Sequence, residues 1–316
     1  MSDNCFAEEK IVGRSPTIKK NWEFIKKAAR SDKNILIMGE TGTGKDLTAK
    51  NVHDFSSRRE RPYVAINCAN IPEELFEAEL FGYVRGSFTG AVKEKEGLLE
   101  TAKDGTVFLD EIGDLTPYLQ AKILRVIDKR ELRRIGETKT RKIHARFIFA
   151  TNKDLQEEVK SGRFRKDLYF RISVLKFFIS PLRERKEDIP LVVNHILERE
   201  NRKGETKKGI SLCALKKLMA YHFPGNVREL ENILERAYIL SEGDQITEKD
   251  IKFDYVLSTY KQSSEMTAEQ LRQILEDCRW NKTKAASEIG KSRRQFYRLL
   301  EKYQMSDCIR KNYFFL

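Results

Sequence analysis

Four short apolar runs recur in the first half of the chain, separated by stretches long enough for a helix. The runs are NILIM (34 to 38), YVAIN (63 to 67), TVFLD (106 to 110) and ARFIFA (145 to 150). Continuous apolar runs of this kind, alternating with helical segments, are typical of parallel strands that are buried on both faces. The pattern predicts a doubly wound α/β domain built on a parallel sheet.

The pattern changes after SPLRERKEDIP (180 to 190), where the strand signal disappears. Helical periodicity follows, as in IPLVVNHILERE and NVRELENILERAYIL, and it predicts a small helical subdomain. Residues 254 to 266 are polar with little periodicity, and the remaining residues look helical again. We expect an α/β subdomain, a helical lid subdomain, a linker and a small all-α domain, with bounds 1–175, 176–253, 254–266 and 267–316.

The first apolar run leads directly into GETGTGKD, and a helical stretch follows. Glycines at this spacing let backbone N–H groups surround phosphate oxygens, the helix N-terminus favours anions, and the lysine reaches the terminal phosphates of a P-loop nucleotide. A glycine-rich turn before a helix is the alternative. We expect nucleotide binding by Gly39, Glu40, Thr41, Gly42, Thr43, Gly44, Lys45 and Asp46. Because Asp46 stands where Ser or Thr would offer a hydroxyl to Mg²⁺, metal coordination by this residue stays open.

The third apolar run ends in an acidic pair, Asp110 and Glu111. Open α/β sheets bind ligands at the carboxyl ends of their strands. Asp110 is therefore expected to hold Mg²⁺, and Glu111 to orient or deprotonate the attacking water, with a polar turn after a strand as the alternative. Asn152 follows another strand end in ARFIFATN, where it can sense or position the γ-phosphate.

Arginines suited to phosphoryl transfer occur in two later segments. GRFRKDLYFRI contains Arg163, Arg165 and Arg171, and a neighbouring subunit can donate such a residue, although most arginines in so basic a chain are solvated. In PGNVREL, Asn226 is predicted as an N-cap and Arg228 lies in the first turn of the next helix. An arginine there opposes the helix dipole, which favours a functional role.

Composition adds charge and compartment to this picture. The chain has 316 residues, enough for two or three domains, and its net charge of +12 favours an acidic partner such as nucleic acid, although solvated basic faces are common. No apolar stretch approaches the roughly 18 residues of a membrane span, and no signal peptide pattern opens the chain, so we expect a cytoplasmic protein without a membrane partner. Widely spaced cysteines without a CxxC pair predict plain thiols at Cys5, Cys68, Cys213, Cys278 and Cys308.

The segment ILEDCRWNKTKAASEIGKSRRQFYRLLEKY predicts two crossing helices, with Gly290 as a C-cap break and Ser292 as the N-cap of the second helix. Small Ala285 and Ala286 suit the close packing of a helix-turn-helix. Residues 267–316 hold eleven Lys or Arg against six Asp or Glu, which favours DNA, while a basic hairpin used for protein contacts is the alternative. Expected DNA contacts are Lys282, Thr283, Lys291, Ser292, Arg293, Arg294, Gln295 and Arg298.

Seven motifs occur in a fixed order: GETGTGKD, GSFTGA, GTVFLDEIGD, FATNKDL, FRKDLYFRI, PLRERKEDIP and PGNVREL. In this order and spacing they resemble the central domain of bacterial enhancer-binding proteins, the AAA+ activators of sigma-54 RNA polymerase, over about residues 10 to 250. The last segment resembles the Fis-type domain that ends most of these proteins and acts as a dimer on palindromic sites. The resemblance implies an ATP- and Mg²⁺-dependent activator that binds enhancer DNA, the upstream activator sequence, and remodels the closed complex of sigma-54 RNA polymerase holoenzyme into an open complex.

The resemblance also gives a role to the second motif. In that family the GAFTGA loop is an exposed insertion that contacts sigma-54, and here it reads GSFTGA. The contact residues would be Phe88 and Thr89, and Gly86 and Gly90 the flexible ends of the loop. A phenylalanine packed inward in an ordinary hairpin is the alternative. Ser87 replaces the usual alanine.

Three more roles follow position by position from the resemblance. Asn67, in AINCAN, matches the asparagine that restrains the catalytic glutamate, so its amide would hydrogen-bond Glu111 in the ground state. Asn152 matches the sensor I residue. Arg228 matches sensor II, which would place it on the nucleotide.

Two further matches concern assembly. Arg165 and Arg171 match the arginines that the family presents across a subunit boundary, which implies a homo-oligomeric ring, a hexamer or heptamer assembled from dimers. Asp46 falls where the family usually carries glutamate, and Phe223 falls where tryptophan is common. Both differences leave the nucleotide assignment unchanged.

Two other classes of function stay open. One is a conventional DNA-binding regulator whose AAA+ domain serves ligand sensing or oligomerisation, but relatives of that kind lack the loop. The other is an AAA+ remodeller of other proteins, which the helix-turn-helix disfavours. About ten residues precede IVGRSPTIKK, too few for a receiver or GAF domain, so we expect control in trans or by expression, or a trimmed chain.

Overall fold

The structure, a computed structural model, describes residues 11–69, 72–203 and 207–253, and short groups of one to three residues between 271 and 303. The chain divides into two compact units, residues 1–252 and 253–316. Within the described residues, no helix combines the length and apolar character that a membrane crossing requires.

A five-stranded parallel sheet forms the centre of the first unit, with strand order β2-β5-β8-β1-β9. The four predicted runs all form strands of this sheet, and the predicted doubly wound α/β class is confirmed. The strands are β1 (Ile35–Met38), β2 (Tyr63–Asn67), β5 (Thr106–Asp110), β8 (Arg146–Thr151) and β9 (Leu175–Phe178).

The two edge strands differ from the expectation of continuous apolar runs. Strand β9 was not predicted, and the expected boundary between residues 175 and 176 runs through it. At an edge only part of the strand is covered, so LKFF alternates between half-buried and exposed positions and includes Lys176. Strand β2, at the opposite edge, is likewise exposed or half-buried except at Ile66. Continuous apolar runs identified the three central strands and the edge strand β2, but not the edge strand β9.

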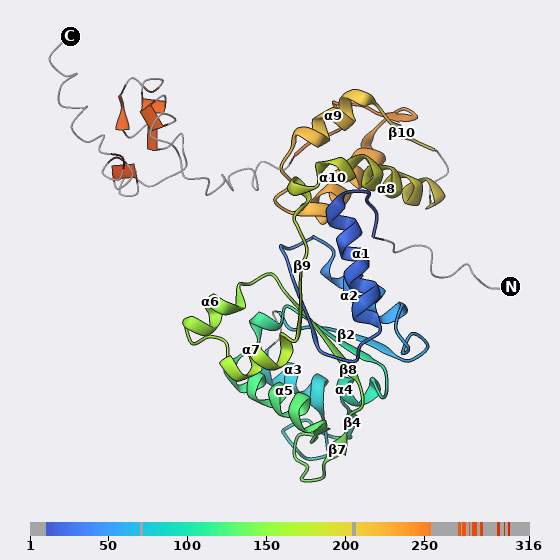
Figure 1. Ribbon diagram of the computed structural model, residues 1–316, viewed down its shortest axis with the longest axis vertical. Helices are drawn as coiled ribbons and strands as arrows, with labels where there is room; N and C mark the ends of the chain where they lie inside the picture. The colour runs from blue at the N-terminus through green and yellow to red at the C-terminus, as the bar shows by residue number, and fades with distance from the viewer. Residues whose placement is uncertain are drawn as a thin grey trace. The chain divides into compact units, whose positions relative to one another are not determined.

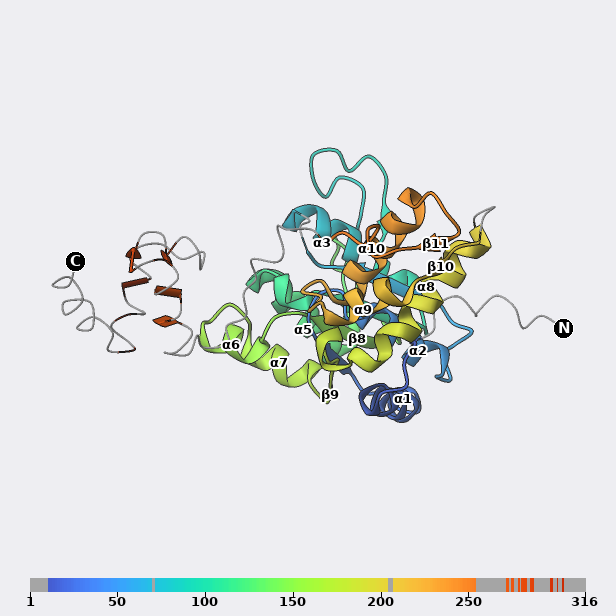
Figure 2. The ribbon, with the colours of Figure 1, turned by 90° about the horizontal axis from the view of Figure 1, so that it is seen from above.

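Helices cover both faces of the sheet because successive strand residues point to opposite sides. Leu36 packs into a core with α3, α4, α5 and α7, whereas Ile35 and Ile37 pack into a second core with α1 and α2. Figure 2 shows α1 and α3 on opposite sides of β8. The helices are α1 (Pro16–Ala29), α2 (Lys45–Asp54), α3 (Glu73–Phe81), α4 (Leu98–Thr101), α5 (Pro117–Lys129), α6 (Leu155–Lys160) and α7 (Lys166–Ile172).

Two antiparallel hairpins leave the α/β layers side by side. The first joins β3 (Gly82–Tyr83) to β4 (Lys95–Glu96), and the second joins β6 (Glu131–Leu132) to β7 (Arg141–Lys142). A bridge between Tyr83 and Ile135 holds them together. Figure 1 shows β4 and β7 at the end of this unit opposite to α8, α9 and α10.

The lid follows β9 and is mainly helical, as predicted. Its helices are α8 (Ile189–Lys203), α9 (Leu212–Ala220) and α10 (Asn226–Leu240), with short 3-10 turns at Leu182–Glu184 and Lys186–Asp188 and a two-stranded pairing of β10 (Gly209–Ile210) with β11 (Gln245–Ile246). Asp188 is fully buried at the start of the lid. Its carboxylate accepts hydrogen bonds from Arg14 N at 2.7 Å and Ser15 Oγ at 2.6 Å, so it ties the segment before α1 to the lid.

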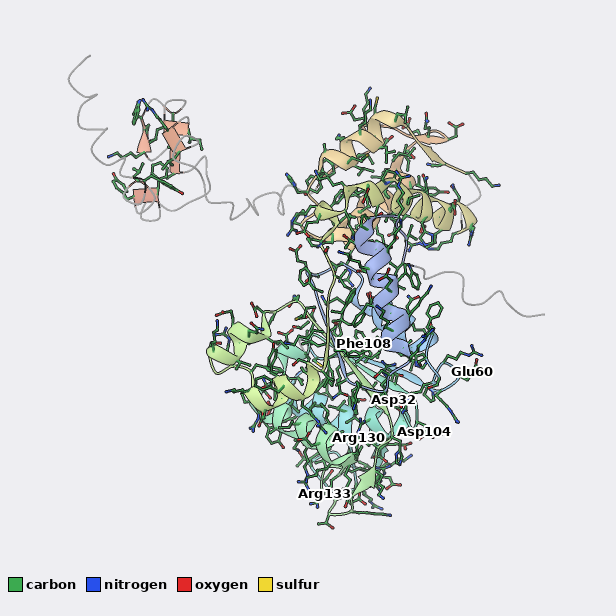
Figure 3. All side chains as sticks on the ribbon, viewed as in Figure 1. Asp32, Glu60, Asp104, Phe108, Arg130 and Arg133 are labelled. Atoms are coloured by element: carbon green, nitrogen blue, oxygen red, sulfur yellow. The ribbon has the colours of Figure 1, made fainter. Side chains whose placement is uncertain are left out.

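The amino ends of the strands are joined by one arginine. Arg58 pairs with Asp32 and donates to the carbonyl oxygens of Asp104 and His144. Asp32 and Asp104 are labelled in Figure 3. The Arg58 guanidinium holds the pKa of Asp32 below its usual value. This end of the sheet is a structural network, and the opposite, carboxyl ends carry the predicted site.

The second unit has a small apolar core of its own. Leu271, Leu275, Cys278, Ala285, Ala286, Phe296 and Leu300 are buried in it. The two alanines that were expected to suit close packing, Ala285 and Ala286, are buried in this core with Phe296. The predicted caps Gly290 and Ser292 lie outside the described residues.

Candidate nucleotide-binding site

The P-loop connects β1 to α2, and its backbone takes conformations that only glycine adopts easily. Gly42 has φ +77° and Gly44 has φ +93°, both in the left-handed region. The Lys45 ammonium is 6% exposed, lies 3.1 Å from the Gly39 carbonyl oxygen and is 3.4 Å from the Glu111 carboxylate. Asp46 is exposed in the first turn of α2, where the helix dipole stabilises a carboxylate. The P-loop therefore places the Lys45 ammonium among backbone groups at the N-terminus of α2.

The acidic pair lies where β5 ends. Glu111 has φ +51° and ψ +47°, a left-handed conformation that turns the chain out of the strand, and its N–H donates to the Asp110 carboxylate at 3.0 Å. Burial, and then the negative charge of Glu111, raise the pKa of Asp110. A cation placed beside this pair would stabilise the ionised form of Asp110 and so oppose both of these influences on its pKa.

The strand order places the carboxyl end of β8, which carries Asn152, between the ends of β5 and β1. Because β8 lies between β5 and β1, Asn152 emerges between the acidic pair and the P-loop. Its N–H donates to Glu111 Oε2 at 2.9 Å, and its side-chain amide donates to Thr41 Oγ1 at 3.1 Å. Asn152 thus links the two halves of the site directly.

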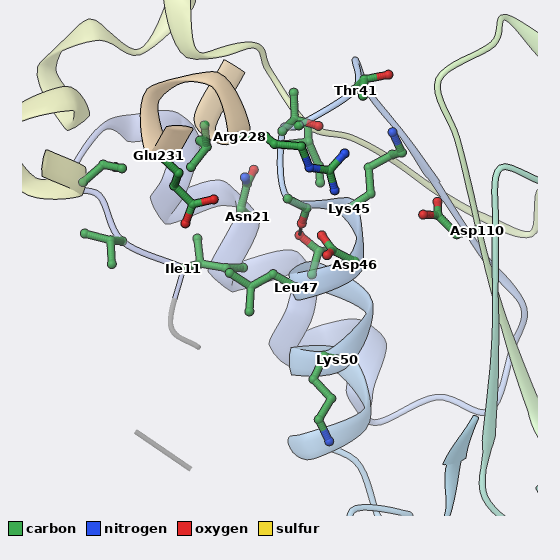
Figure 4. A pocket seen from close by; sticks show the side chains of 18 of the residues that line it. Ile11, Asn21, Thr41, Lys45, Asp46, Leu47, Lys50, Asp110, Arg228 and Glu231 are labelled. Carbon is green, nitrogen blue, oxygen red and sulfur yellow. Dashed lines mark hydrogen bonds between the residues drawn. The ribbon is translucent and has the colours of Figure 1, made fainter. Parts of the chain in front are cut away.

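The lid closes over the P-loop through the start of α10. Val227 N donates to the Gly42 carbonyl oxygen at 2.9 Å, and Arg228 lines the same pocket as Lys45 and Asp110. In Figure 4, Arg228 lies above α2 between Glu231 on one side and Lys45 on the other. The structure therefore places the predicted sensor II arginine in the nucleotide pocket.

The N-cap prediction for Asn226 was wrong. Gly225 holds the N-cap position, and Asn226 is the first helical residue, with φ +54° and no exposed surface. Its side chain donates to Glu40 Oε2 and to the Thr41 carbonyl oxygen, each at 3.1 Å, and accepts from Leu182 N at 2.8 Å. The Asn226 amide therefore joins the lid to the P-loop and does not cap its own helix.

Sequence reasoning also missed an ion pair at this interface. Arg183, at the start of the lid, forms a two-pronged contact with Glu40 of the P-loop, at 2.7 and 2.6 Å. This arginine lowers the pKa of Glu40. Arg185 adds a long hydrogen bond to the Thr43 carbonyl oxygen at 3.4 Å. A charged residue inside GETGTGKD was the one available signal, and its partner lies 143 positions away.

These elements surround a pocket of about 570 Å³, a size typical of small-molecule sites. Lys45 and Asp110 lie on one side of it, and Ile11, Asn21 and Glu231 lie toward the other (Figure 4). The eight P-loop positions predicted from the sequence include six that line it, namely Thr41, Gly42, Thr43, Gly44, Lys45 and Asp46.

The expected hydrogen bond between Asn67 and Glu111 is not formed between these two described residues. Asn67 ends β2 directly beside Asp110, but its side-chain oxygen accepts from Ala69 N at 2.8 Å. The Glu111 carboxylate instead accepts from Asn152 N and approaches Lys45. The strand register nevertheless keeps Asn67 next to the acidic pair.

The structure does not bring Arg165 or Arg171 into the nucleotide pocket of the same chain. Arg165 is exposed and pairs with Asp167, at 3.0 and 2.6 Å. Arg171 pairs with Asp128 at 2.7 Å. Beside Arg165 the surface has a shallow hollow bordered by Phe170, whose side chain is 63% exposed. Both arginines are therefore on the outside of the α/β subdomain.

The GSFTGA loop lies between β3 and β4. Phe88 leaves 46% of its surface exposed and rests its ring edge-on against Tyr83, with centroids 5.0 Å apart. Thr89 is exposed beside it. Gly86 and Gly90 have φ +80° and +104°, and neither has a neighbouring atom near the position of a side chain. The alternative of an inward-packed phenylalanine is not what the structure shows.

Ser87 anchors this loop to the second hairpin. A Cβ atom at Gly136 would lie 2.6 Å from Ser87 Cβ, so only glycine permits this approach. Arg134 of the same hairpin contacts Glu100 at 2.7 Å, just beyond β4. The loop is held at its base and open at its tip.

One predicted DNA-contacting residue can be placed. Lys282 lies 5.2 Å from the centre of the Tyr297 ring, a cation–π contact. The other seven residues of that set lie outside the described residues: Thr283, Lys291, Ser292, Arg293, Arg294, Gln295 and Arg298. Cys68, Cys213 and Cys278 are free thiols, as expected, and Cys5 and Cys308 are likewise outside the described part.

Replacing Gly42 with alanine is expected to destabilise the lid interface more than replacing Gly162. Both glycines have similar φ, +77° and +74°, so both substitutions carry a similar left-handed strain of about 1–2 kcal/mol. A Cβ at Gly42 would lie 2.2 Å from the Gly225 carbonyl oxygen, whereas Gly162 has nothing within 4 Å. Thermal unfolding should therefore show a larger fall in midpoint for Gly42→Ala. Equal midpoints would contradict the close approach of the lid.

The P-loop, the acidic strand end and the helical lid define an AAA+ nucleotide-binding domain. Residues 11–178 match the family described as Sigma-54 interaction domain, residues 183–269 match the AAA+ ATPase lid domain, and residues 265–303 match the Fis family of bacterial regulatory proteins. The chain belongs to the sigma-54 interaction domain family.

Similar proteins agree with this family. The phenol regulator MopR of Acinetobacter guillouiae is 47% identical over 251 residues, which is 79% of this chain and 44% of MopR. The response regulator protein PilR of Pseudomonas aeruginosa is 42% identical over 308 residues, covering 92% of this chain and 69% of PilR. The chain thus spans less than half the length of MopR and of XylR from Pseudomonas putida, of which it covers 42%.

Solved structures of NtrX from Brucella abortus share the fold. The structure of NtrX in complex with ADP has a TM-score of 0.71 and 30% identity, and the alignment covers 93% of this chain and 69% of that one. The structure of NtrX in complex with ATP has a TM-score of 0.73 and 29% identity, with 93% and 70% covered.

Proposed function

We propose that this chain is an ATP-hydrolysing transcriptional activator that binds enhancer DNA and remodels closed complexes of sigma-54 RNA polymerase into open complexes through its GSFTGA loop. The observation that carries the proposal is the combination of a complete P-loop site with an exposed Phe88 and Thr89 on a loop anchored only at its base. An aromatic residue left half-exposed beside a threonine is suited to contact another protein.

The nucleotide chemistry follows from the pocket. Backbone N–H groups of the P-loop and the Lys45 ammonium would bind the β- and γ-phosphates, and Arg228 of the lid would approach from the other side. That NtrX structures are described in complex with ADP and ATP supports an adenine nucleotide here. Binding would then draw the lid and the P-loop together around the phosphates.

Mg²⁺ fits the donor set of this site. Within the described residues there is no cluster of three or more His, Cys, Asp or Glu side chains that would hold a metal without help. Mg²⁺ in nucleotide sites needs only one or two carboxylates, because phosphates and waters supply its other ligands. Asp110 is one of the carboxylates that line the pocket and lies on the same side as Lys45, and the ion would neutralise phosphate charge there.

Hydrolysis would depend on the residues around Glu111. Its carboxylate would orient or deprotonate the attacking water, and the hydrogen bond from Asn152 N holds that carboxylate in place. Through Thr41 the same asparagine also contacts the P-loop, so it can report the presence of the γ-phosphate to the acidic pair. In another state of the hydrolysis cycle, the Asn67 amide would donate a hydrogen bond to the Glu111 carboxylate in place of Asn152 N.

A ring is proposed because Arg165 and Arg171 lie outside the pocket of their own chain. A neighbouring subunit in a hexamer or heptamer, assembled from dimers, would receive these arginines at its γ-phosphate. The Fis-type segment would pair protomers and bind the enhancer. We also propose the remaining domain limits given above, with the lid beginning after β9.

Consecutive segments of the chain connect the nucleotide site to the GSFTGA loop. Asn67 lies beside the acidic pair, and α3 begins at Glu73 and ends at Phe81, directly before the hairpin that carries the loop. A change at the γ-phosphate can therefore displace one short helix and move the loop with it.

Thr89→Ala tests this proposal on a supercoiled sigma-54 promoter with ATP. We expect the variant to keep its ATPase rate within about twofold and to lose open-complex formation, because Thr89 is exposed and away from the nucleotide pocket. Val92→Ala, on the same loop and 73% exposed, is the matched control and should retain activity. A wild-type chain that hydrolyses ATP but opens no promoter would count against the activator function.

A further inference from the structure

Asn21 of α1 is a buried amide that the described part of the protein leaves without a hydrogen-bond partner. Its side chain is 4% exposed, and neither end of the amide contacts a described donor or acceptor. The other asparagines buried to this degree each donate at least one side-chain hydrogen bond: Asn34 to Arg171 O, Asn51 to Leu47 O and Asn226 to Glu40 and Thr41. The Asn21 amide atoms are not among the fully enclosed side-chain atoms that lack a partner, so the amide keeps contact with open space although the residue is buried.

That open space is the nucleotide pocket. Asn21 lines this pocket together with Lys45 and the rest of the P-loop. Figure 4 shows its amide directed from α1 toward the space below Arg228 and Glu231. Lys45 and Asp110 mark the phosphate side, so Asn21 lies on the side left for the base.

The walls around Asn21 are apolar. The pocket is lined there by side chains of the segment before α1, of α1, of α8 and of α10, which are Ile11, Val12, Ile18, Val192, Ile196 and Val227. Such a surface suits a flat aromatic base. Charged side chains line the same pocket, and among them Arg199 contacts Glu231 at 3.1 Å and Glu235 at 2.9 Å. Asn21 therefore offers an uncharged hydrogen-bonding group beside these apolar side chains.

We propose that Asn21 hydrogen-bonds the edge of the purine base and favours adenine, a role that rests on the nucleotide site proposed above. An asparagine amide presents one donor and one acceptor side by side. Adenine presents the complementary pair, its 6-amino donor beside the acceptor N7. On the same edge guanine presents two acceptors, O6 and N7, and one of them would face the amide oxygen. Asn21 is thus a specificity-determining residue for the base.

The test compares Asn21→Leu with the wild type by calorimetry on the full chain, with ADP, GDP and purine riboside 5′-diphosphate, which lacks the 6-amino group. Leucine keeps the volume and the helix but removes both hydrogen-bonding atoms. The wild type should bind ADP about tenfold more tightly than the analogue, which keeps the N7 acceptor but lacks the 6-amino donor. Asn21→Leu should reduce that ratio to about one by weakening ADP more than the analogue. The preference for ADP over GDP should narrow in the same variant.

Asn51→Leu is the matched control, since Asn51 is similarly buried on the adjacent helix but donates to the Leu47 carbonyl oxygen of that helix and does not line the pocket. It should leave the ratio of ADP to analogue unchanged. If Asn21→Leu weakens ADP and the analogue equally, or weakens neither, Asn21 does not read the base. Asn21→Ala, which also removes both hydrogen-bonding atoms but adds no bulk, gives the same decision if the leucine variant fails to fold.

The two proposals fail separately in this design. If the wild type binds ADP, and Lys45→Ala abolishes that binding, the nucleotide site stands whatever Asn21 does. An unchanged ratio in Asn21→Leu then overturns only the role of Asn21. If the wild type binds no adenine nucleotide at all, both the proposed function and this inference are overturned.

Discussion

Glutamine in place of Glu111 is expected to lower the rate of ATP hydrolysis by about 10²- to 10⁴-fold, the range that a positioned general base contributes. The substitution preserves the shape of the side chain and one oxygen that can accept from Asn152 N. It removes the negative charge 3.4 Å from the Lys45 ammonium and the ability to take a proton from water. ATP binding should stay within a few-fold, because the P-loop and Arg228 are untouched.

Steady-state ATPase and calorimetric ADP affinity, measured on the same preparation, check this result. Asp114→Asn is the matched control, because Asp114 lies in the same DEIGD segment but pairs with Lys153 at 2.5 Å. That variant should hydrolyse ATP at a rate within about threefold of the wild type. Undiminished turnover by Glu111→Gln would remove Glu111 from the mechanism and leave the water to another group.

The second large effect is expected from Arg165→Ala. If a neighbouring subunit receives this arginine, its loss should reduce hydrolysis by about 10³- to 10⁵-fold while ADP affinity changes little. Arg165 is exposed and lies outside the pocket of its own chain, so it can reach a neighbouring subunit, and its loss should leave ADP affinity nearly unchanged. Its pairing with Asp167 lies on the surface and contributes little to stability, so the fold should survive.

Mixing decides whether the arginine acts in trans. In a ring that contains Arg165→Ala and Glu111→Gln subunits, some interfaces join an intact Glu111 to an intact Arg165 from the neighbour. Random equimolar assembly makes about a quarter of the interfaces competent, so activity should reappear although each variant is inactive by itself.

Arg163→Ala serves as the control for this series, because Arg163 belongs to the same segment but is held by Glu158 at 2.7 and 2.8 Å. It should hydrolyse ATP at close to the wild-type rate. If no ratio of the two inactive variants restores hydrolysis, Arg165 acts within its own subunit or not at all.

Much of the site was predictable because its chemistry lies in short segments. The spacing of Gly39, Gly44 and Lys45, and the acidic pair at the end of an apolar run, are local features that any strand-loop-helix context brings to a sheet edge. The structure places Lys45, Asp110, Glu111 and Asn152 at that edge, as the pattern predicted.

The misses share a physical origin. Strand β9 was not recognised because an edge strand is covered only in part and its residues need not be apolar. Asn226 was expected to cap its own helix, a local use of the amide, but burial against the P-loop gave it nonlocal partners. For the ion pair of Glu40 with Arg183, the charge of Glu40 inside the P-loop was the only local signal, and nothing near it in the sequence identified a partner 143 positions away.

The amino-acid sequence by itself indicated which segments form the P-loop and carry the acidic pair, because glycine spacing, strand ends and apolar runs act over a few residues. The exposure of Phe88 in the GSFTGA loop was expected only from the family resemblance, and the structure decided it against an inward-packed phenylalanine. Only the tertiary structure decided which of these segments meet. Strand order put Asn152 between the P-loop and the acidic pair, and the lid brought Asn226 onto Glu40 across 186 positions. Asn21 became an unpaired amide in the pocket for the same reason. Contacts between distant segments are set by how whole layers pack, which no local pattern encodes.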